Sequence, residues 1–86
     1  MAVIFTTAEG YKIAKNSGSA ENTGGAAADV DATITFSELE KVLYVIAAYG
    51  DVPVTEKSIS GNQVTVTAKS VPAGTTATVY VVVLGF

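Results

Sequence analysis

TATVYVVVLGF, residues Thr76 to Phe86, is apolar on both of the faces that a β-strand presents. Successive side chains of a strand point to opposite faces of its sheet. Three alternate valines therefore share one face, and the residues of the other face are Tyr80, Val82 and Leu84. A sheet that packs on a core normally keeps one face polar and wet. The pattern thus raises the question of what covers the second face.

Short β-rich segments separated by Gly and Pro turns fill much of the rest of the 86 residues. Residues 3–15 predict a first hairpin, and VDATITF, residues 30–36, alternates as a half-buried strand does. The run TEKSISGNQVTVTAK, residues 55–69, flanks Gly61-Asn62, a dipeptide that favours a two-residue II′ or I′ hairpin turn. The sequence predicts a single all-β domain over residues 1–86, a small antiparallel β-sandwich or barrel of about seven strands.

The segment SELEKVLYVIAAYG, residues 37–50, fits two structures. Ser37 and Glu40 match a helix capping box, and the spacing of the apolar residues also fits a helical stripe. Against a helix, VLYVIAAY is rich in β-branched and aromatic residues. We expect a short helical turn at Ser37–Lys41 followed by a central strand at Val42–Tyr49, with a helix as the alternative.

Residues Asn16–Asp29 are small, polar and rich in glycine. Such a composition offers little apolar surface to bury. The sequence predicts a flexible loop or arm here, ordered only by contact with a neighbouring subunit.

The second apolar face predicts self-association. At ~25 cal/mol per Å², covering 300 Å² would contribute about 7 kcal/mol, comparable to the whole stability of a small domain. Most soluble oligomers are built from identical chains, so another copy is the simplest cover. The alternative is that the first hairpin or a helix at residues 37–49 covers this face within one chain. The expected interface residues are Tyr80, Val82, Leu84, Phe86, Val42, Tyr44 and Ile46.

Composition excludes several function classes. Cysteine, histidine and arginine are absent, five lysines are scattered, and the formal net charge is −3. Binding to nucleic-acid phosphates requires clustered Lys and Arg, so no nucleic-acid partner is expected. The apolar runs are far shorter than the ~20 residues of a membrane-spanning helix, and no signal peptide is visible. We expect no cofactor, no membrane association and no enzymatic activity.

Carboxylates give the candidates for metal or acid/base chemistry. Asp29 and Asp31, with Glu21 or Asp51, offer oxygen ligands for Ca²⁺, although the spacing matches no complete ion-binding loop. Glu38 and Glu40 are the candidate pair of carboxylates for acid/base catalysis, but surface and capping roles explain these two residues better.

Tyrosines give the candidates for sugar stacking. Three of the four lie within apolar strands, where core or interface packing explains them better; the four are Tyr11, Tyr44, Tyr49 and Tyr80.

A strand, a hairpin around Gly-Asn and a last strand after AGT follow one another in residues 34–50, 58–68 and 73–85. This pattern resembles small β-sandwich proteins of virus particles, such as capsid-decoration, tail and fibre modules of phages or archaeal viruses. It covers about half of the chain. The resemblance implies a non-enzymatic, self-assembling component of a virion or extracellular assembly, with its own copies and other virion proteins as partners. Two alternatives stay open: a carbohydrate-binding module, or a filament subunit in which AVIFTT or TVYVVVLGF pairs with a neighbour's sheet edge.

Overall fold

The computed structural model describes the backbone of residues 2–86 and the side chains of residue 3 and residues 6–86. Over these residues the chain forms seven β-strands and no helix, which confirms the all-β expectation. The strands are β1 (Ala2–Thr6), β2 (Lys12–Glu21), β3 (Ala28–Thr35), β4 (Val42–Gly50), β5 (Val54–Ser60), β6 (Gln63–Val71) and β7 (Thr76–Gly85).

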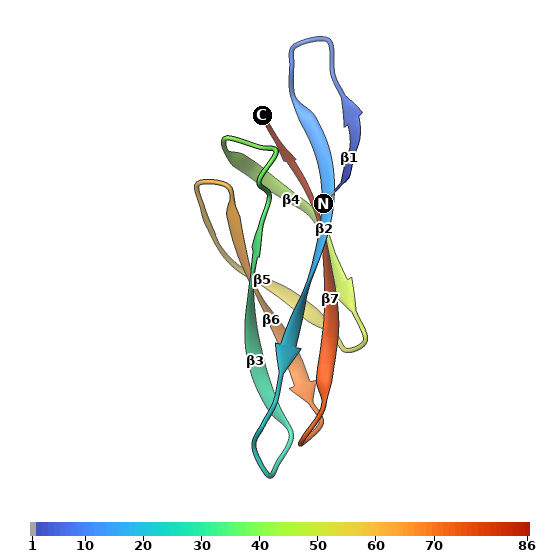
Figure 1. Cartoon of the computed structure of the whole chain (residues 1–86), viewed down its shortest axis with the longest axis vertical. Helices are drawn as coiled ribbons and strands as arrows, with labels where there is room; N and C mark the ends of the chain where they lie inside the picture. The colour runs from blue at the N-terminus through green and yellow to red at the C-terminus, as the bar shows by residue number, and fades with distance from the viewer. Residues whose placement is uncertain (1) are drawn as a thin grey trace.

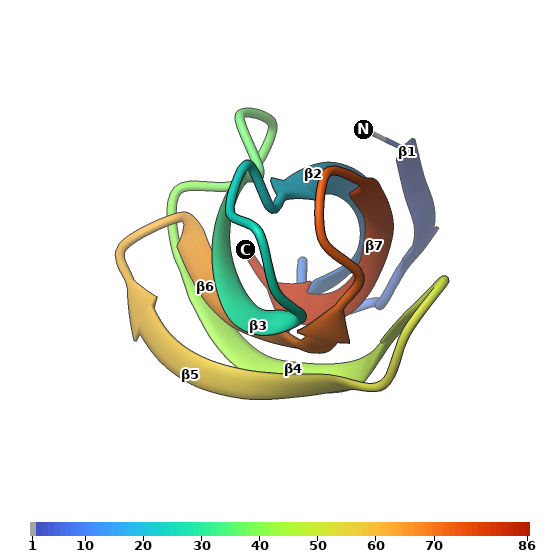
Figure 2. The ribbon, with the colours of Figure 1, turned by 90° about the horizontal axis from the view of Figure 1, so that it is seen from below.

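The strands form two antiparallel sheets (Figure 1). The four-stranded sheet has the order β1-β2-β7-β4, and the three-stranded sheet has the order β3-β6-β5. The β1–β2 and β5–β6 connections are hairpins within one sheet, whereas every other connection carries the chain from one sheet to the other. Viewed along the long axis, the two sheets wrap around a common centre (Figure 2).

The core lies between the two sheets and is built mainly of valine. The central strand β7 runs beside β2 through ten consecutive pairs without irregularity, and this ladder forms one wall. Alternate residues of β6 and β7 fill the centre with fully buried side chains, among them Val64, Val66, Val79, Val81 and Val83. The predicted alternation of residues 30–36 is confirmed, since Ala32, Ile34 and Phe36 are buried.

The hairpin at Gly61-Asn62 is also confirmed. Ser60 pairs with Gln63, so the loop has two residues. Gly61 has φ +57° and Asn62 does not have a positive φ, which matches a type II′ turn rather than type I′.

The predicted loop at residues 16–29 is wrong over much of its length. Residues up to Glu21 continue β2, and β3 begins at Ala28, so only residues 22–27 connect the two strands. The valine-rich strand β7 needs a hydrogen-bonding partner along its whole length, and backbone pairing does not depend on large side chains. Gly18 also allows β2 to pack closely on the other sheet, because a Cβ there would lie only 3.0 Å from the side chain of Ile34.

The predicted helical turn at Ser37–Lys41 is wrong as well. The amide of Leu39 donates to the carbonyl of Phe36 at 2.9 Å, which closes one tight turn. The next amides donate to distant parts of the chain: those of Glu40 and Lys41 to the carbonyl of Phe86, just beyond β7, and that of Val42 to the carbonyl of Gly61 in the β5–β6 turn. With these donors engaged elsewhere, the i to i−4 bonds of a helix do not form.

The second half of that segment is a strand, as predicted, but β4 is an edge strand and not a central one. Its pairing with β7 shifts twice, between Val42 and Tyr44 and between Val45 and Ala47, and each shift places one extra residue on β4. Such β-bulges are common at sheet edges.

Candidate interaction face

The outer face of the four-stranded sheet carries the second apolar surface of β7. Leu84, Val82 and Tyr80 point outward, away from the buried valines, and are half-buried by the neighbours of β7 in the same sheet. On one side these residues pair with Ile13, Lys15 and Ser17 of β2, and on the other with Tyr44, Ala47 and Tyr49 of β4. Three rows of mostly apolar residues therefore cross the sheet.

The two bulges add further apolar side chains to this face. In each bulge, two residues of β4 stand opposite one residue of β7. Leu43 and Tyr44 oppose Leu84, and Ile46 and Ala47 oppose Val82; all four of these β4 residues are exposed. We call the combined surface the apolar face; its residues are Ile13, Leu43, Tyr44, Ile46, Ala47, Tyr49, Tyr80, Val82 and Leu84.

The apolar face is large for a chain of this size. Tyr44 keeps 63% of its surface exposed, and Ile46 keeps 47%. Taking about 200 Å² for a large side chain, the whole face exposes roughly 500–600 Å². That is the upper end of the largest apolar patch on an ordinary monomer, and patches of this size usually mark an interaction site.

Lys15 is the one charged residue in the three rows that cross the sheet, and its ammonium lies over two tyrosine rings. The rings of Tyr49 and Tyr80 stack with centroids 5.3 Å apart and an interplanar angle of 21°. The ammonium of Lys15 lies 5.5 Å from the Tyr49 centroid and 5.3 Å from the Tyr80 centroid, within cation–π range. Its polar interaction with the Tyr49 side chain, ahead of that with Tyr80, raises the pKa of Lys15.

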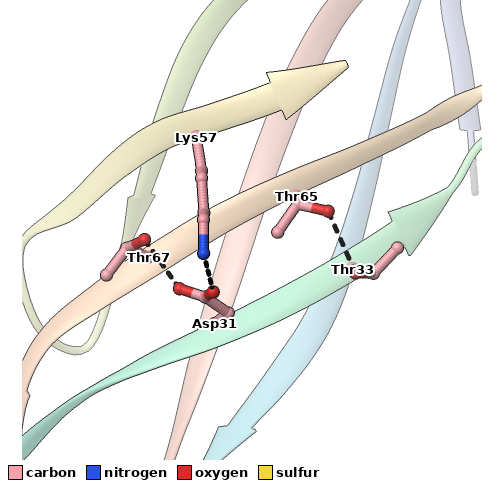
Figure 3. Close-up of polar contacts among 5 residues, drawn as sticks. All are labelled: Asp31, Thr33, Lys57, Thr65 and Thr67. Atoms are coloured by element: carbon pink, nitrogen blue, oxygen red, sulfur yellow. Dashed lines mark hydrogen bonds and ion pairs between the residues drawn. The ribbon is translucent and has the colours of Figure 1, made fainter. Parts of the chain in front are cut away.

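The outer face of the three-stranded sheet is polar instead (Figure 3). Lys57 forms an ion pair with Asp31, and the hydroxyl of Thr67 donates to the same carboxylate at 2.8 Å. The hydroxyls of Thr33 and Thr65 meet at 3.1 Å across β3 and β6. The Lys57 ammonium, followed by the Thr67 hydroxyl, lowers the pKa of Asp31.

Asp29 and Asp31, the Ca²⁺ candidates, each have a cationic partner of their own. Asp29 accepts hydrogen bonds from the amide of Ser70 at 3.0 Å and the ammonium of Lys69 at 3.1 Å. The Ser70 amide, followed by Lys69, lowers the pKa of Asp29. Over the part of the chain that the structure describes, no three acidic side chains gather as a metal site requires. The two aspartates thus serve as links between strands.

Val42 is a predicted interface residue that does not lie on the apolar face. It is 1% exposed and belongs to the core, because the first bulge follows it and leaves it facing inward. Tyr44, Ile46, Tyr80, Val82 and Leu84 lie together on the apolar face, and their role in an interface stays a prediction.

Other predicted positions lie elsewhere on the chain. Phe86 is exposed just beyond β7, where its backbone is bonded to that of Lys41. Glu38 and Glu40 are exposed in the turn before β4. Tyr11 is exposed next to the start of β2.

Sequence reasoning missed four members of the apolar face, and it missed Lys15 in the row between them; the four are Ile13, Leu43, Ala47 and Tyr49. Their place on the face follows from the pairing of β2 and β4 with β7, which depends on the register of strands distant in sequence. An alternating pattern in Tyr11 to Lys15 was present, but it does not identify the strand beside which these residues lie.

The first hairpin does not cover the apolar face. β1 pairs with residues Lys12–Lys15 of β2 and so extends the same sheet sideways (Figures 1 and 2). No helix at residues 37–49 is present to cover it either. Both single-chain explanations of the second apolar face are therefore contradicted.

An open hollow of about 470 Å³ adjoins the face where β4 turns into β5. Residues 48–54 line it. Its one carboxylate, Asp51, accepts a hydrogen bond from the amide of Thr78 at 2.9 Å, which ties the turn to β7. This arrangement explains Asp51 as a structural residue.

The described residues contain no helix long and apolar enough to cross a membrane. Comparison with protein-family models, curated proteins and solved structures finds no match for this chain.

Proposed function

We propose that the protein is a non-enzymatic structural subunit that assembles with its own copies through the apolar face. One observation carries this proposal: the two outer faces of the molecule differ in kind. One is a polar surface of threonines and ion pairs, and the other exposes roughly 500–600 Å² of mostly apolar side chains.

The energetics favour covering this face. At ~25 cal/mol per Å², the ~130 Å² exposed by Tyr44 alone corresponds to about 3 kcal/mol of hydrophobic free energy. Aromatic residues of this kind are frequent anchors of protein interfaces. A carbohydrate-binding role has less support, because Tyr49 and Tyr80 already stack on each other and share Lys15.

The placement of this assembly in a virus particle comes from the sequence resemblance alone. It adds other virion proteins as partners and a virion or extracellular location to the proposal. Self-association itself does not depend on that resemblance.

Two isoleucines allow a matched test. Ile46 lies on the apolar face, whereas Ile59, 36% exposed, lies on the edge strand β5 of the other sheet. We expect sedimentation velocity to show self-association of the wild type at micromolar concentration. Ile46→Asp should abolish it by placing a charge in an apolar contact, and Ile59→Asp should not. Circular dichroism checks that both variants are folded.

A wild-type protein that stays monomeric up to millimolar concentration would contradict the proposal. Equal loss of association in the two folded variants would contradict the choice of face.

A further inference from the structure

We infer that two copies meet face to face in a closed pair, with the apolar face of one lying on that of the other, rather than edge to edge in a growing sheet. This inference rests on the proposed function and adds the geometry of the contact. The occupant of the apolar face is then a second copy of this chain.

Three of the four edge strands carry bulges of their own, and the pairing of the fourth, β3, shifts between Ala28 and Val30 with the extra residue on β6. β4 carries two extra residues, and β5 carries one at Lys57. The β1–β2 register shifts between Val3 and Phe5. Bulges and charged side chains on an edge strand hinder its pairing with another chain. By contrast, the interior β2–β7 pair has no irregularity.

The fourth edge belongs to β3 and lies beside β2. The side-chain amide of Asn16 on β2 donates to the carbonyl of Thr35 on β3 at 2.8 Å, so part of this edge is already bonded across the two sheets. β7 has a partner on each side, which rules it out as the edge that a filament would extend.

Among the side chains that the structure describes, only one outer sheet face is apolar, and this explains why the assembly would stop at two. Packing of this face on itself uses the same surface on both copies, so the pair turns the polar outer faces of its three-stranded sheets to solvent. With roughly 500–600 Å² from each copy, the pair would bury about 1,000–1,200 Å² in total. Stable, specific interfaces begin at about 1,200 Å², so a closed pair is at the lower limit of this size class.

Lys15 is compatible with such a contact. Its ammonium lies over two tyrosines of its own chain, and these rings would accompany it into the interface. Cation–π contacts of this kind strengthen when water is removed.

The natural absence of cysteine allows single spin labels to test the geometry. Ser17→Cys carries a label beside the apolar face, and Thr65→Cys carries one on the opposite outer face. In a face-to-face pair, the two Thr65 positions are separated by two further sheet-to-sheet spacings of ~10 Å, so their distance should exceed that of the Ser17 pair by about 20 Å. Pulsed EPR measures both distances, and sedimentation equilibrium measures the mass.

The expected result is a mass that levels off at two copies, with one distance for each label and the shorter one at residue 17. Similar distances at both positions, or mass that rises without limit and filaments in electron micrographs, would overturn the closed pair and leave self-assembly standing. A monomer at every concentration would overturn both.

Discussion

Asn22 anchors the connection between β2 and β3, and its replacement by alanine should destabilise the fold. It is a buried polar residue, only 6% exposed. Its side-chain amide donates to the carbonyl of Val71 at 2.8 Å and to that of Ala26 at 2.9 Å, and its oxygen accepts from the amide of Gly24 at 2.9 Å. One side chain thus orders its own loop and ties that loop to the end of β6.

The size of the effect depends on whether the group that loses its hydrogen bond to Asn22 is buried or can bind water instead. The carbonyl of Val71 is buried, and an unsatisfied buried group costs about 1–3 kcal/mol. The other two bonds are part-buried and can be replaced by water, so each accounts for about 0.5–1 kcal/mol. We expect Asn22→Ala to lower the free energy of unfolding by about 2–5 kcal/mol. A domain of this size has a total of roughly 4–13 kcal/mol.

Urea unfolding followed by circular dichroism measures this loss, at a concentration where the protein is monomeric. Asn16→Ala is the matched control, since its exposed bond to Thr35 should contribute about 1 kcal/mol or less. Hydrogen exchange across residues 23–27 should also accelerate in Asn22→Ala. If the two variants lose equal stability, the argument that burial sets the cost is wrong.

Two further predictions concern the strands. Because Lys57 lowers the pKa of Asp31, the carboxylate stabilises the fold above about pH 4 and loses this effect as the pH falls. The melting temperature of Asp31→Asn should therefore fall less steeply between pH 5 and pH 3 than that of the wild type. Equal slopes would contradict a stabilising role of the Asp31 carboxylate. Gly50→Ala should destabilise strongly, because its Cβ would lie 2.3 Å from the carbonyl oxygen of Thr78. Gly25→Ala, which meets no atom within 4 Å, should have little effect in the same thermal melts, and similar losses for both would refute the steric argument.

Strands whose pattern is local could be predicted from sequence. The hairpin at Gly61-Asn62 needs only a turn that glycine allows and two flanking β-rich runs. Residues 30–36 alternate cleanly because β3 has one face on the core and one in water. In both segments, local preference and tertiary environment agree, and such agreement allows the structure to be predicted from the sequence.

The strand β2 could not be predicted, because its stability comes from its partners. Asn16, Ser17 and Gly18 have weak β-propensity. They form a strand because β7 pairs with them residue by residue and because Ile34 packs where Gly18 has no side chain. Such information lies 61 to 65 positions away on β7 and 16 positions away at Ile34, and it does not appear in any short window of the sequence.

The bulges of β4 account for both the ambiguous sequence pattern and the apolar face. A regular strand places every second residue inward, whereas β4 places every third residue inward, at Val42, Val45 and Ala48. A period of three lies between that of a strand and the 3.6 residues of a helix, which explains why the segment fitted both. The same two extra residues leave Leu43 and Ile46 exposed on the outside. A helix would have faced the core with one stripe, but the bulged strand keeps its core contacts and directs most of its apolar side chains outward, onto the surface through which we propose that the protein associates.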